Sequence, residues 1–281
     1  LIPEGLGDYN DHAVEGELLP KLKPVNVPVE YDFNRNDRGR YLNTIDNVKG
    51  VLMLNNIDVR YNVIKKRMEI DIPDTKFIAD MQDESALISI EDRCIQMQIP
   101  ESKVRDYLKL LAVEYNPVMD WMESRPWDRQ SRLQAFLDSI TSTNQALKEM
   151  LMKKWLISCV AAACEPKGVE LEGILVFQGA QGLGKTLWFK RLANYEEGWL
   201  LEGATLNPAD KDSVKQAVSH WIVELGELES TFKKSDIDML KAFTTKRNDE
   251  LRLPYDRAST TYQRRTAFYA SVNAREFLTD T

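Results

Sequence analysis

The sequence predicts an α/β fold with a parallel central sheet, built as a P-loop nucleotide-binding domain and preceded by a small, mostly helical domain. The first observation is an apolar run at 174–177 that breaks into a glycine-rich loop and resumes as a helix. The second is a pair of later apolar strands, 221–223 and 266–272, each followed by polar residues. Strands separated by helical segments are typical of a parallel sheet covered by helices.

The loop at 179–186 reads GAQGLGKT and fits the pattern G-x-x-x-x-G-K-[ST] between a strand and a helix. Glycines allow positive φ, so several backbone N–H groups can face one phosphate beside the positive end of the helix dipole. A glycine-rich turn with a chance lysine is the alternative, which the flanking strand and helix disfavour. A dinucleotide-binding loop does not fit, because the glycines miss the G-x-G-x-x-G spacing. The expected ATP-binding residues are Gly179, Ala180, Gln181, Gly182, Leu183, Gly184, Lys185, Thr186 and Leu187.

Polar side chains near the strand ends are expected to complete a site for ATP and Mg²⁺. We expect Lys185 to reach the β- and γ-phosphates, and Thr186 to bind Mg²⁺ together with Glu224. Glu227 and Asn273 are expected to position the attacking water. Glu227 is equally consistent with the start of a solvated helix, and an asparagine after a strand is by itself only a turn former.

Composition limits the function classes. The 281 residues are 43% hydrophobic with a net charge of −7, so the chain can bury cores but is not basic throughout, as a chromatin-type DNA binder would be. Two histidines argue against a histidine-based metal site or triad, and three cysteines without zinc spacing are expected to be buried free thiols. No apolar run could span a membrane and no secretory signal precedes the chain, which favours the cytoplasm. The first residue is Leu1, so a fragment or processed chain is expected.

Three regions are predicted: an arm or linker over 1–40, a small domain over 41–118 and the nucleotide-binding domain over 119–281. The arm is rich in proline, glycine and asparagine. Within the small domain, helices are expected at 43–54, 85–94 and 103–115, and short strands at 59–63 and 68–72. Trp121 and Trp127 could stack on bases, but their spacing favours core residues.

Between residues 241 and 265 the charge balance becomes basic, with seven Lys and Arg against three Asp and Glu. Basic residues interleaved with tyrosines are typical of contact with a nucleic-acid backbone, although an exposed charged hairpin is the competing interpretation. The expected nucleic-acid contacts are Lys241, Lys246, Arg247, Arg252, Tyr255, Arg257, Arg264 and Arg265.

From about residue 43 onward, the chain resembles the virulence-associated protein E family of phage and genomic-island replication proteins, grouped with the superfamily 3 helicases of the AAA+ class. The later motifs are specific in combination. They are PVMDW at 117–121, WDRQSRL at 127–133, KWLIS at 154–158, GAQGLGKT at 179–186, WIVELGEL at 221–228, KSDI at 234–237, LKAF at 240–243, RLPY at 252–255, RRT at 264–266 and SVNAREFL at 271–278.

The resemblance implies an ATP-hydrolysing replicative DNA helicase in a bacterial host cell. It also implies a hexameric homo-oligomer that holds single-stranded DNA in a central channel, with nucleotide sites between subunits and the 241–265 hairpin facing the DNA. The sequence ends before the family's Gly-Asn-Arg-Arg-Phe segment, so the arginine finger is expected beyond Thr281, and Arg275 is not expected to replace it. No primase constellation of paired carboxylates is present, so priming would belong to another region or to a partner primase.

Two rival functions remain open. One is an ATP-gated DNA-binding or initiator module that assembles at DNA without unwinding it. The other is a small-molecule phosphotransferase, which would leave the basic stretch at 241–265 without a purpose.

Overall fold

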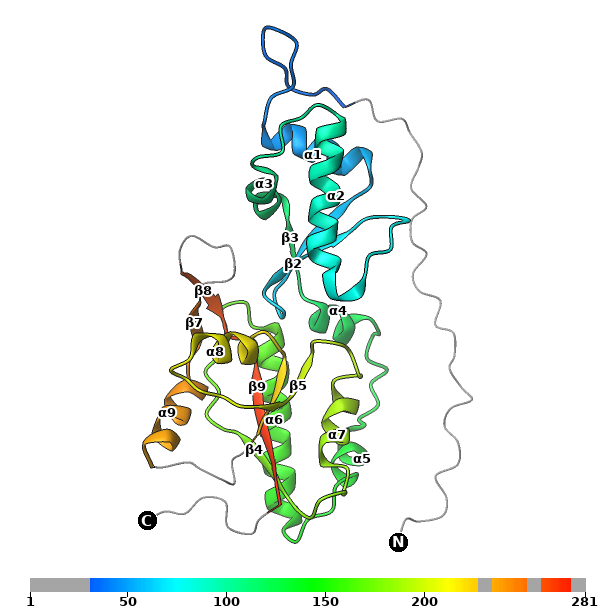
Figure 1. Cartoon of the computed structure of the whole chain (residues 1–281). Coiled ribbons are helices and arrows are strands. Elements are labelled where there is room, and N and C mark those ends of the chain that lie inside the picture. Colours follow the sequence, from blue (N-terminus) through cyan, green and yellow to red (C-terminus); the bar gives the residue numbers. More distant parts are fainter. Residues whose placement is uncertain (1–30, 227–233, 252–258, 274–281) are drawn as a thin grey trace.

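The computed structural model describes residues 31–226, 234–251 and 259–273, and these form two lobes (Figure 1). In the smaller lobe, helices pack on a small sheet. Its elements are α1 (Ile45–Leu54), β1 (Asp58–Asn62), β2 (Arg67–Asp71), the 3-10 helix η1 (Ala79–Met81), α2 (Gln82–Gln96), α3 (Val104–Leu111) and β3 (Val113–Tyr115).

The larger lobe is built around a parallel sheet. Its elements are α4 (Pro117–Glu123), α5 (Leu133–Asp138), α6 (Gln145–Cys164), β4 (Leu175–Gln178), α7 (Lys185–Leu192), β5 (Leu200–Ala204), α8 (Lys211–Val218), β6 (Ile222–Leu225), α9 (Lys234–Thr244), β7 (Asn248–Leu251), β8 (Thr260–Gln263) and β9 (Ala267–Val272). The sheet order is β4-β9-β6-β5, and β7 and β8 form a separate antiparallel hairpin. This arrangement confirms the predicted α/β fold with a parallel central sheet.

Helices cover both faces of the central sheet. Because side chains alternate along a strand, β9 directs Tyr269 to one face and Phe268 to the other. Tyr269 belongs to a core that includes Trp155 of α6 and Phe189 of α7. Phe268 belongs to a second core with residues of α8 and α9. Strand β6 is buried at all four positions, as expected for a parallel strand covered on both faces.

The smaller lobe has its own hydrophobic core, to which α1, α2 and α3 contribute Val51, Ile90 and Leu108. Its sheet has the order β2-β1-β3, with β2 antiparallel and β3 parallel to β1. The predicted division at residue 118 stays a prediction, and Val118 itself lies in the core of the larger lobe.

Three segments differ from the sequence-based expectations. The single helix expected over 103–115 ends at Leu111, because residues 113–115 pair with β1 and complete the small sheet. Strand β5 was not expected, although it follows the apolar residue Trp199. Residues 31–40 were assigned to a linker, but they contact α1 through side-chain and backbone hydrogen bonds.

The described residues contain no helix that is both long enough and apolar enough to cross a membrane. All three cysteines are free. Cys94 and Cys159 are buried as predicted, whereas Cys164 is half-buried. Burial raises the pKa of the Cys94 thiol to about 11, so this thiol is protonated at neutral pH.

The turn between β1 and β2 of the smaller lobe packs against the larger lobe. Ile64 is fully buried and belongs to the core of the larger lobe, together with Trp199 and Trp221. The stem of Lys65 lies against Gly198, where a Cβ would come within 2.6 Å of the Lys65 Cε. A side chain at position 198 would therefore displace the end of the Lys65 side chain.

Lys66, in the same turn, is a buried cation at the junction of the lobes. It is only 3% exposed, and its Nζ makes no hydrogen bond with the described residues. Burial lowers the pKa of Lys66 to about 7, an effect that the attraction of Asp249 opposes and the repulsion of Arg265 and Arg264 increases. Docking of the lobes therefore disfavours a proton on this amine.

Replacing Lys66 should stabilise the protein in a pH-dependent way. The unfolded chain holds this proton up to the ordinary pKa of 10.5, whereas the folded chain releases it near pH 7, so wild-type stability rises with pH between these values. We expect Lys66→Met to raise the free energy of unfolding by about 1–3 kcal/mol near pH 7, with a gain that shrinks toward pH 10. Urea denaturation at several pH values measures this difference. The exposed Lys76→Met serves as a control, and an equal gain at all pH values would contradict the assignment.

Candidate phosphate and metal site

The loop at 179–184 connects β4 to α7 with a backbone that requires glycine. Gly182 has φ 84° and Gly184 has φ 75°, both in the left-handed region, and Gly184 is the residue that caps α7. A side chain at either position would cost about 1–2 kcal/mol. Gly179 donates its backbone N–H to the Val272 carbonyl over 3.1 Å, which fixes the start of the loop beside the end of β9.

The Lys185 ammonium lies across the mouth of this loop. Its Nζ donates to the carbonyl oxygens of Gly179 at 2.7 Å and Ala180 at 3.0 Å, and to Asn273 Oδ1 at 3.0 Å. None of these three acceptors carries a charge. The ammonium can therefore exchange them for phosphate oxygens, which bind a cation more strongly.

Thr186 and Glu224 place two oxygen ligands beside the lysine. The Thr186 hydroxyl donates to Glu224 Oε1 over 3.3 Å, and Glu224 is 8% exposed at the end of β6. Hydroxyl and carboxylate oxygens suit Mg²⁺, which usually takes one or two protein carboxylates and completes its shell with waters and substrate phosphates. Within the described ranges, no group of three His, Cys, Asp or Glu residues could form a complete metal cage. The donor set thus fits a cation that arrives with phosphate.

Strand order brings Asn273 to the same place. Because β9 lies between β4 and β6, the residue after β9 stands between the loop and Glu224. This strand order allows the hydrogen bond from Lys185 Nζ to Asn273 Oδ1. The structure thus brings together Lys185, Thr186, Glu224 and Asn273, whereas Glu227 lies outside the described residues.

Tyr269 lies beside Glu224 of this cluster, and the sequence did not point to it. It stands opposite Glu224 in the pairing of β6 and β9, and its ring stacks on Phe189 with centroids 3.4 Å apart. Burial, followed by the nearby Glu224 carboxylate, raises the pKa of the Tyr269 hydroxyl well above its ordinary value. The hydroxyl makes no hydrogen bond of good geometry with the described residues. The signal available in the sequence was a tyrosine in an otherwise apolar strand.

The remaining loop residues expected to bind nucleotide follow the same path. Ala180, Gln181 and Leu183 are exposed in the loop, and Leu187 is exposed in the first turn of α7. Their backbone N–H groups, and not their side chains, would face a phosphate in such a loop.

Apart from Arg264, the expected nucleic-acid contacts divide into three groups. Lys241 and Lys246 are exposed, and Arg247 is exposed while forming a 3.5 Å ion pair with Glu170. Arg265 is half-buried and donates to the Ala163 carbonyl over 2.7 Å. The third group, Arg252, Tyr255 and Arg257, lies outside the described residues.

The prediction that Arg264 contacts nucleic acid is wrong in this structure. Arg264 is fully buried and forms two parallel bonds with Asp249, Nε to Oδ2 at 2.9 Å and Nη2 to Oδ1 at 2.5 Å. Its Nη1 also donates to the Phe243 carbonyl, and its guanidinium lies 4.1 Å from the Phe243 ring centroid. A buried arginine can remain charged only with such partners, so Arg264 fixes the base of the β7–β8 hairpin to α9.

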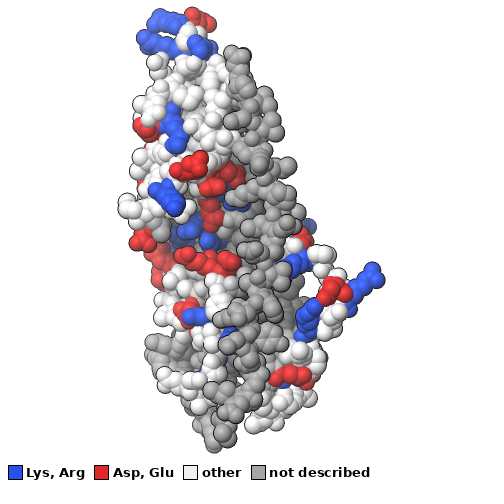
Figure 2. All heavy atoms as spheres, turned by 90° about the vertical axis from the view of Figure 1, so that its right-hand side faces the viewer, with Lys and Arg blue, Asp and Glu red and all other residues white. Residues whose placement is uncertain are grey.

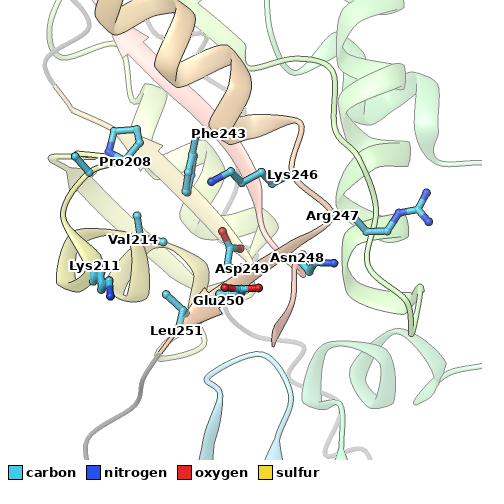
Figure 3. A pocket seen from close by; sticks show the side chains of 11 residues that line it. Pro208, Lys211, Val214, Phe243, Lys246, Arg247, Asn248, Asp249, Glu250 and Leu251 are labelled. Atoms are coloured by element: carbon cyan, nitrogen blue, oxygen red, sulfur yellow. The ribbon is translucent and has the colours of Figure 1, made fainter. Parts of the chain in front are cut away.

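A hollow of about 480 Å³ lies beside the base of this hairpin, between α8 and β7 (Figure 3). Lys246 extends toward Phe243 at its rim, whereas Arg247 points away from it. The hollow contains no glycine-rich loop, so it does not replace the site at Lys185 as the candidate for phosphate chemistry. Its lining residues are Pro208, Ala209, Lys211, Val214, Phe243, Lys246, Arg247, Asn248, Asp249, Glu250 and Leu251.

Comparisons with known proteins identify the family. The model of the virulence-associated protein E-like domain matches residues 122–281, more than half of the chain. Among solved structures, the A form apo structure of the NrS-1 C-terminal region is similar at 16% identity and a TM-score of 0.47, covering 80% of this chain and 56% of that one. A second apo structure of that region gives 17% identity and a TM-score of 0.45 with the same coverage. The chain thus spans little more than half the length of these structures, and no curated protein matches it significantly.

Breaking the buried pair of Arg264 and Asp249 should be strongly destabilising. Arg264→Met leaves the Asp249 carboxylate buried and unpaired, so we expect a loss of about 3–5 kcal/mol in the free energy of unfolding. The double variant Arg264→Met/Asp249→Leu should recover most of this loss. Urea denaturation measures both, and Arg247→Met, which removes an exposed ion pair, should change stability by less than about 1 kcal/mol. Similar losses in the single and double variants would contradict this assignment.

Removing the Tyr269 hydroxyl should not weaken the fold. Because a buried hydroxyl without a partner costs free energy, we expect Tyr269→Phe to leave the free energy of unfolding unchanged or raise it by up to about 1 kcal/mol. Tyr107→Phe is the matched comparison, since that hydroxyl donates to the Asn43 carbonyl over 3.0 Å and its removal should cost about 1 kcal/mol. A comparable loss for Tyr269→Phe, measured by urea denaturation, would show that its hydroxyl bonds to Glu224.

Proposed function

The chain belongs to the virulence-associated protein E-like family, and from that premise we propose that it is an ATP-hydrolysing DNA helicase acting in replication of a phage, prophage or genomic island. One observation carries the proposal. A glycine loop, the Lys185 amine, the Thr186–Glu224 pair and Asn273 converge at one edge of a parallel sheet. That edge is where open α/β sheets bind their ligands.

Each of these groups has a role that its position supports. Lys185 would bind the β- and γ-phosphates after releasing its three neutral acceptors. Thr186 and Glu224 would hold Mg²⁺, which would offset the charge of the phosphate oxygens. Asn273 is adjacent to the lysine and would hold the attacking water near the γ-phosphate.

Single-stranded DNA is the proposed substrate along which the protein moves. The described part of the 241–265 segment offers Lys241 and Lys246 as exposed cations that form no ion pair with a described carboxylate. The sequence between β7 and β8 contains Arg252, Tyr255 and Arg257, and the described base of this hairpin is fixed by the pairing of Arg264 with Asp249. Cations and a tyrosine suit a nucleic-acid backbone and its bases.

Assembly into a ring, as a hexamer, is part of the proposal. The outer face of α6 exposes large apolar side chains along its length, an unusual surface for a monomer. They are Leu147, Met150, Leu151, Ile157 and Val160. A neighbouring subunit that covers this face could also supply an arginine to the nucleotide site.

The test is the ATPase rate with Mg²⁺, with and without single-stranded DNA, at about 50 and 200 mM salt. We expect stimulation by DNA that weakens steeply with salt, because backbone contacts release counterions. Lys185→Ala should lower the rate about 10²–10³-fold, since one electrostatic group contributes about 3–4 kcal/mol in the transition state. Lys190→Ala, on the same helix and paired with Glu202 at 2.9 Å, is the matched control and should retain activity.

Other outcomes would select a different function. Hydrolysis of ATP without any response to DNA would overturn the helicase proposal and favour an ATP-gated DNA-binding module. Transfer of phosphate to a small acceptor would favour a phosphotransferase. Equal ATPase activity of Lys185→Ala and wild type would contradict the assignment of the ATP site to the loop at Lys185.

A further inference from the structure

A second basic feature lies at the far end of the smaller lobe. The segment 34–42 folds back on itself as a hairpin and carries Arg35, Arg38 and Arg40 within six residues. Figure 2 shows basic side chains gathered at this end of the molecule. In Figure 1 the hairpin lies above α1, at the opposite end of the molecule from the loop between β4 and α7. It is therefore separate from the proposed ATP site and from the β7–β8 hairpin.

The turn of this hairpin is rigidly built. Asn36 Oδ1 accepts hydrogen bonds from the backbone N–H groups of Arg38 and Arg40, both at 3.0 Å. The Gly39 N–H donates to the Asn36 carbonyl over 2.8 Å, and Gly39 has φ 76°, which favours glycine. The side chains of Arg38 and Arg40 take no part in these bonds, so their guanidinium groups remain available.

A buried asparagine anchors the hairpin to α1. Asn47 is fully buried, and its Oδ1 accepts from the Asn34 N–H over 2.7 Å. Its Nδ2 donates to the carbonyls of Asn34 at 2.9 Å and Leu42 at 2.8 Å, so one side chain holds both arms. The ring of Phe33 packs where Gly50 has no side chain, since a Cβ there would come within 2.8 Å of it.

The arginines of this hairpin are not engaged in salt bridges within the described part of the chain. No ion pair joins Arg35, Arg38 or Arg40 to a described carboxylate. One carboxylate, Asp37, lies in the same turn, and Asp32 and Asp46 lie near its base. In a chain with net charge −7, a rigid turn carrying three arginines against one acid is a local site for an anion.

From this geometry we infer that the 34–42 hairpin binds the phosphate backbone of duplex DNA. Single-stranded DNA sites combine cations with open aromatic faces on which bases stack. The only aromatic ring in the described hairpin, Tyr41, is covered by Arg35 at 4.3 Å and packs edge-on against Phe33. The hairpin thus offers charge without a stacking platform, which suits phosphates and not unpaired bases.

This inference rests on the proposed function, because it assumes that the protein works on DNA. If the larger lobe moves along one strand, duplex remains ahead of it or behind it. A basic turn at the far end of the smaller lobe could hold that duplex while the strands separate. The contact would be independent of sequence, since phosphate contacts position the DNA but do not read it.

The test uses the double variant Arg38→Gln/Arg40→Gln in the full chain, which leaves the Arg35–Tyr41 contact intact. Binding to a blunt DNA duplex and to a single strand of equal length is measured by fluorescence anisotropy over a range of salt concentrations. We expect weaker duplex binding by about tenfold at low salt and a salt slope reduced by about 2, or about 1 per lost phosphate contact. Single-strand binding and DNA-stimulated ATPase activity should be unchanged.

Two further variants make the result specific. Lys76→Gln/Lys154→Gln removes the same charge from exposed positions away from the hairpin and should bind duplex as wild type does. Arg38→Lys/Arg40→Lys keeps the charge and should retain most of the binding. Unchanged duplex binding, or an equal loss of binding for duplex and single strand, would overturn the inference. None of these results would affect the ATPase test of the proposed function.

Discussion

The position of β9 between β4 and β6 is the constraint on which the candidate site depends. Because all three strands are parallel, their carboxyl ends meet at one edge of the sheet. The hydrogen bond from the Gly179 backbone N–H to the Val272 carbonyl fixes the glycine loop to the end of β9. Asn273 then follows beside Lys185, and Glu224 lies near the end of β6, within reach of Thr186. With a different strand order, the same sequence would place Lys185, Glu224 and Asn273 far from one another.

Buried charge concentrates where the lobes and the β7–β8 hairpin meet. Arg264 and Asp249 pair with good geometry at the base of that hairpin, whereas Lys66 enters the same region from the smaller lobe without a hydrogen bond to any described residue. The pKa of Lys66 responds to Asp249, Arg264 and Arg265, so the turn of one lobe and the hairpin of the other are electrostatically coupled. Burying an amine without a hydrogen-bond partner costs free energy, so Lys66 weakens the contact between the lobes.

Local chemistry can be recognised in the sequence of this protein. The loop at 179–186 could be recognised because its glycines, lysine and threonine are adjacent in the chain and have fixed spacing. The prediction for Arg264 was wrong, because the sequence does not show which of the seven basic residues in this segment are buried and which are exposed. Only the pairing with Asp249 and the carbonyl of Phe243 shows that this arginine is structural. Tyr269 was missed for a related reason, since its neighbour Glu224 is distant in sequence.

The sequence by itself determined the α/β class, the glycine loop, and the strands that end in polar residues, because hydrophobic periodicity and turn chemistry act over a few residues. It did not determine that residues 113–115 would leave their helix to pair with β1, or that residues 34–42 would fold onto Asn47. Those outcomes depend on hydrogen bonds between segments that are distant in the chain. The tertiary structure alone decided which charged side chains are buried and paired and which remain exposed, because burial is a property of the packed molecule.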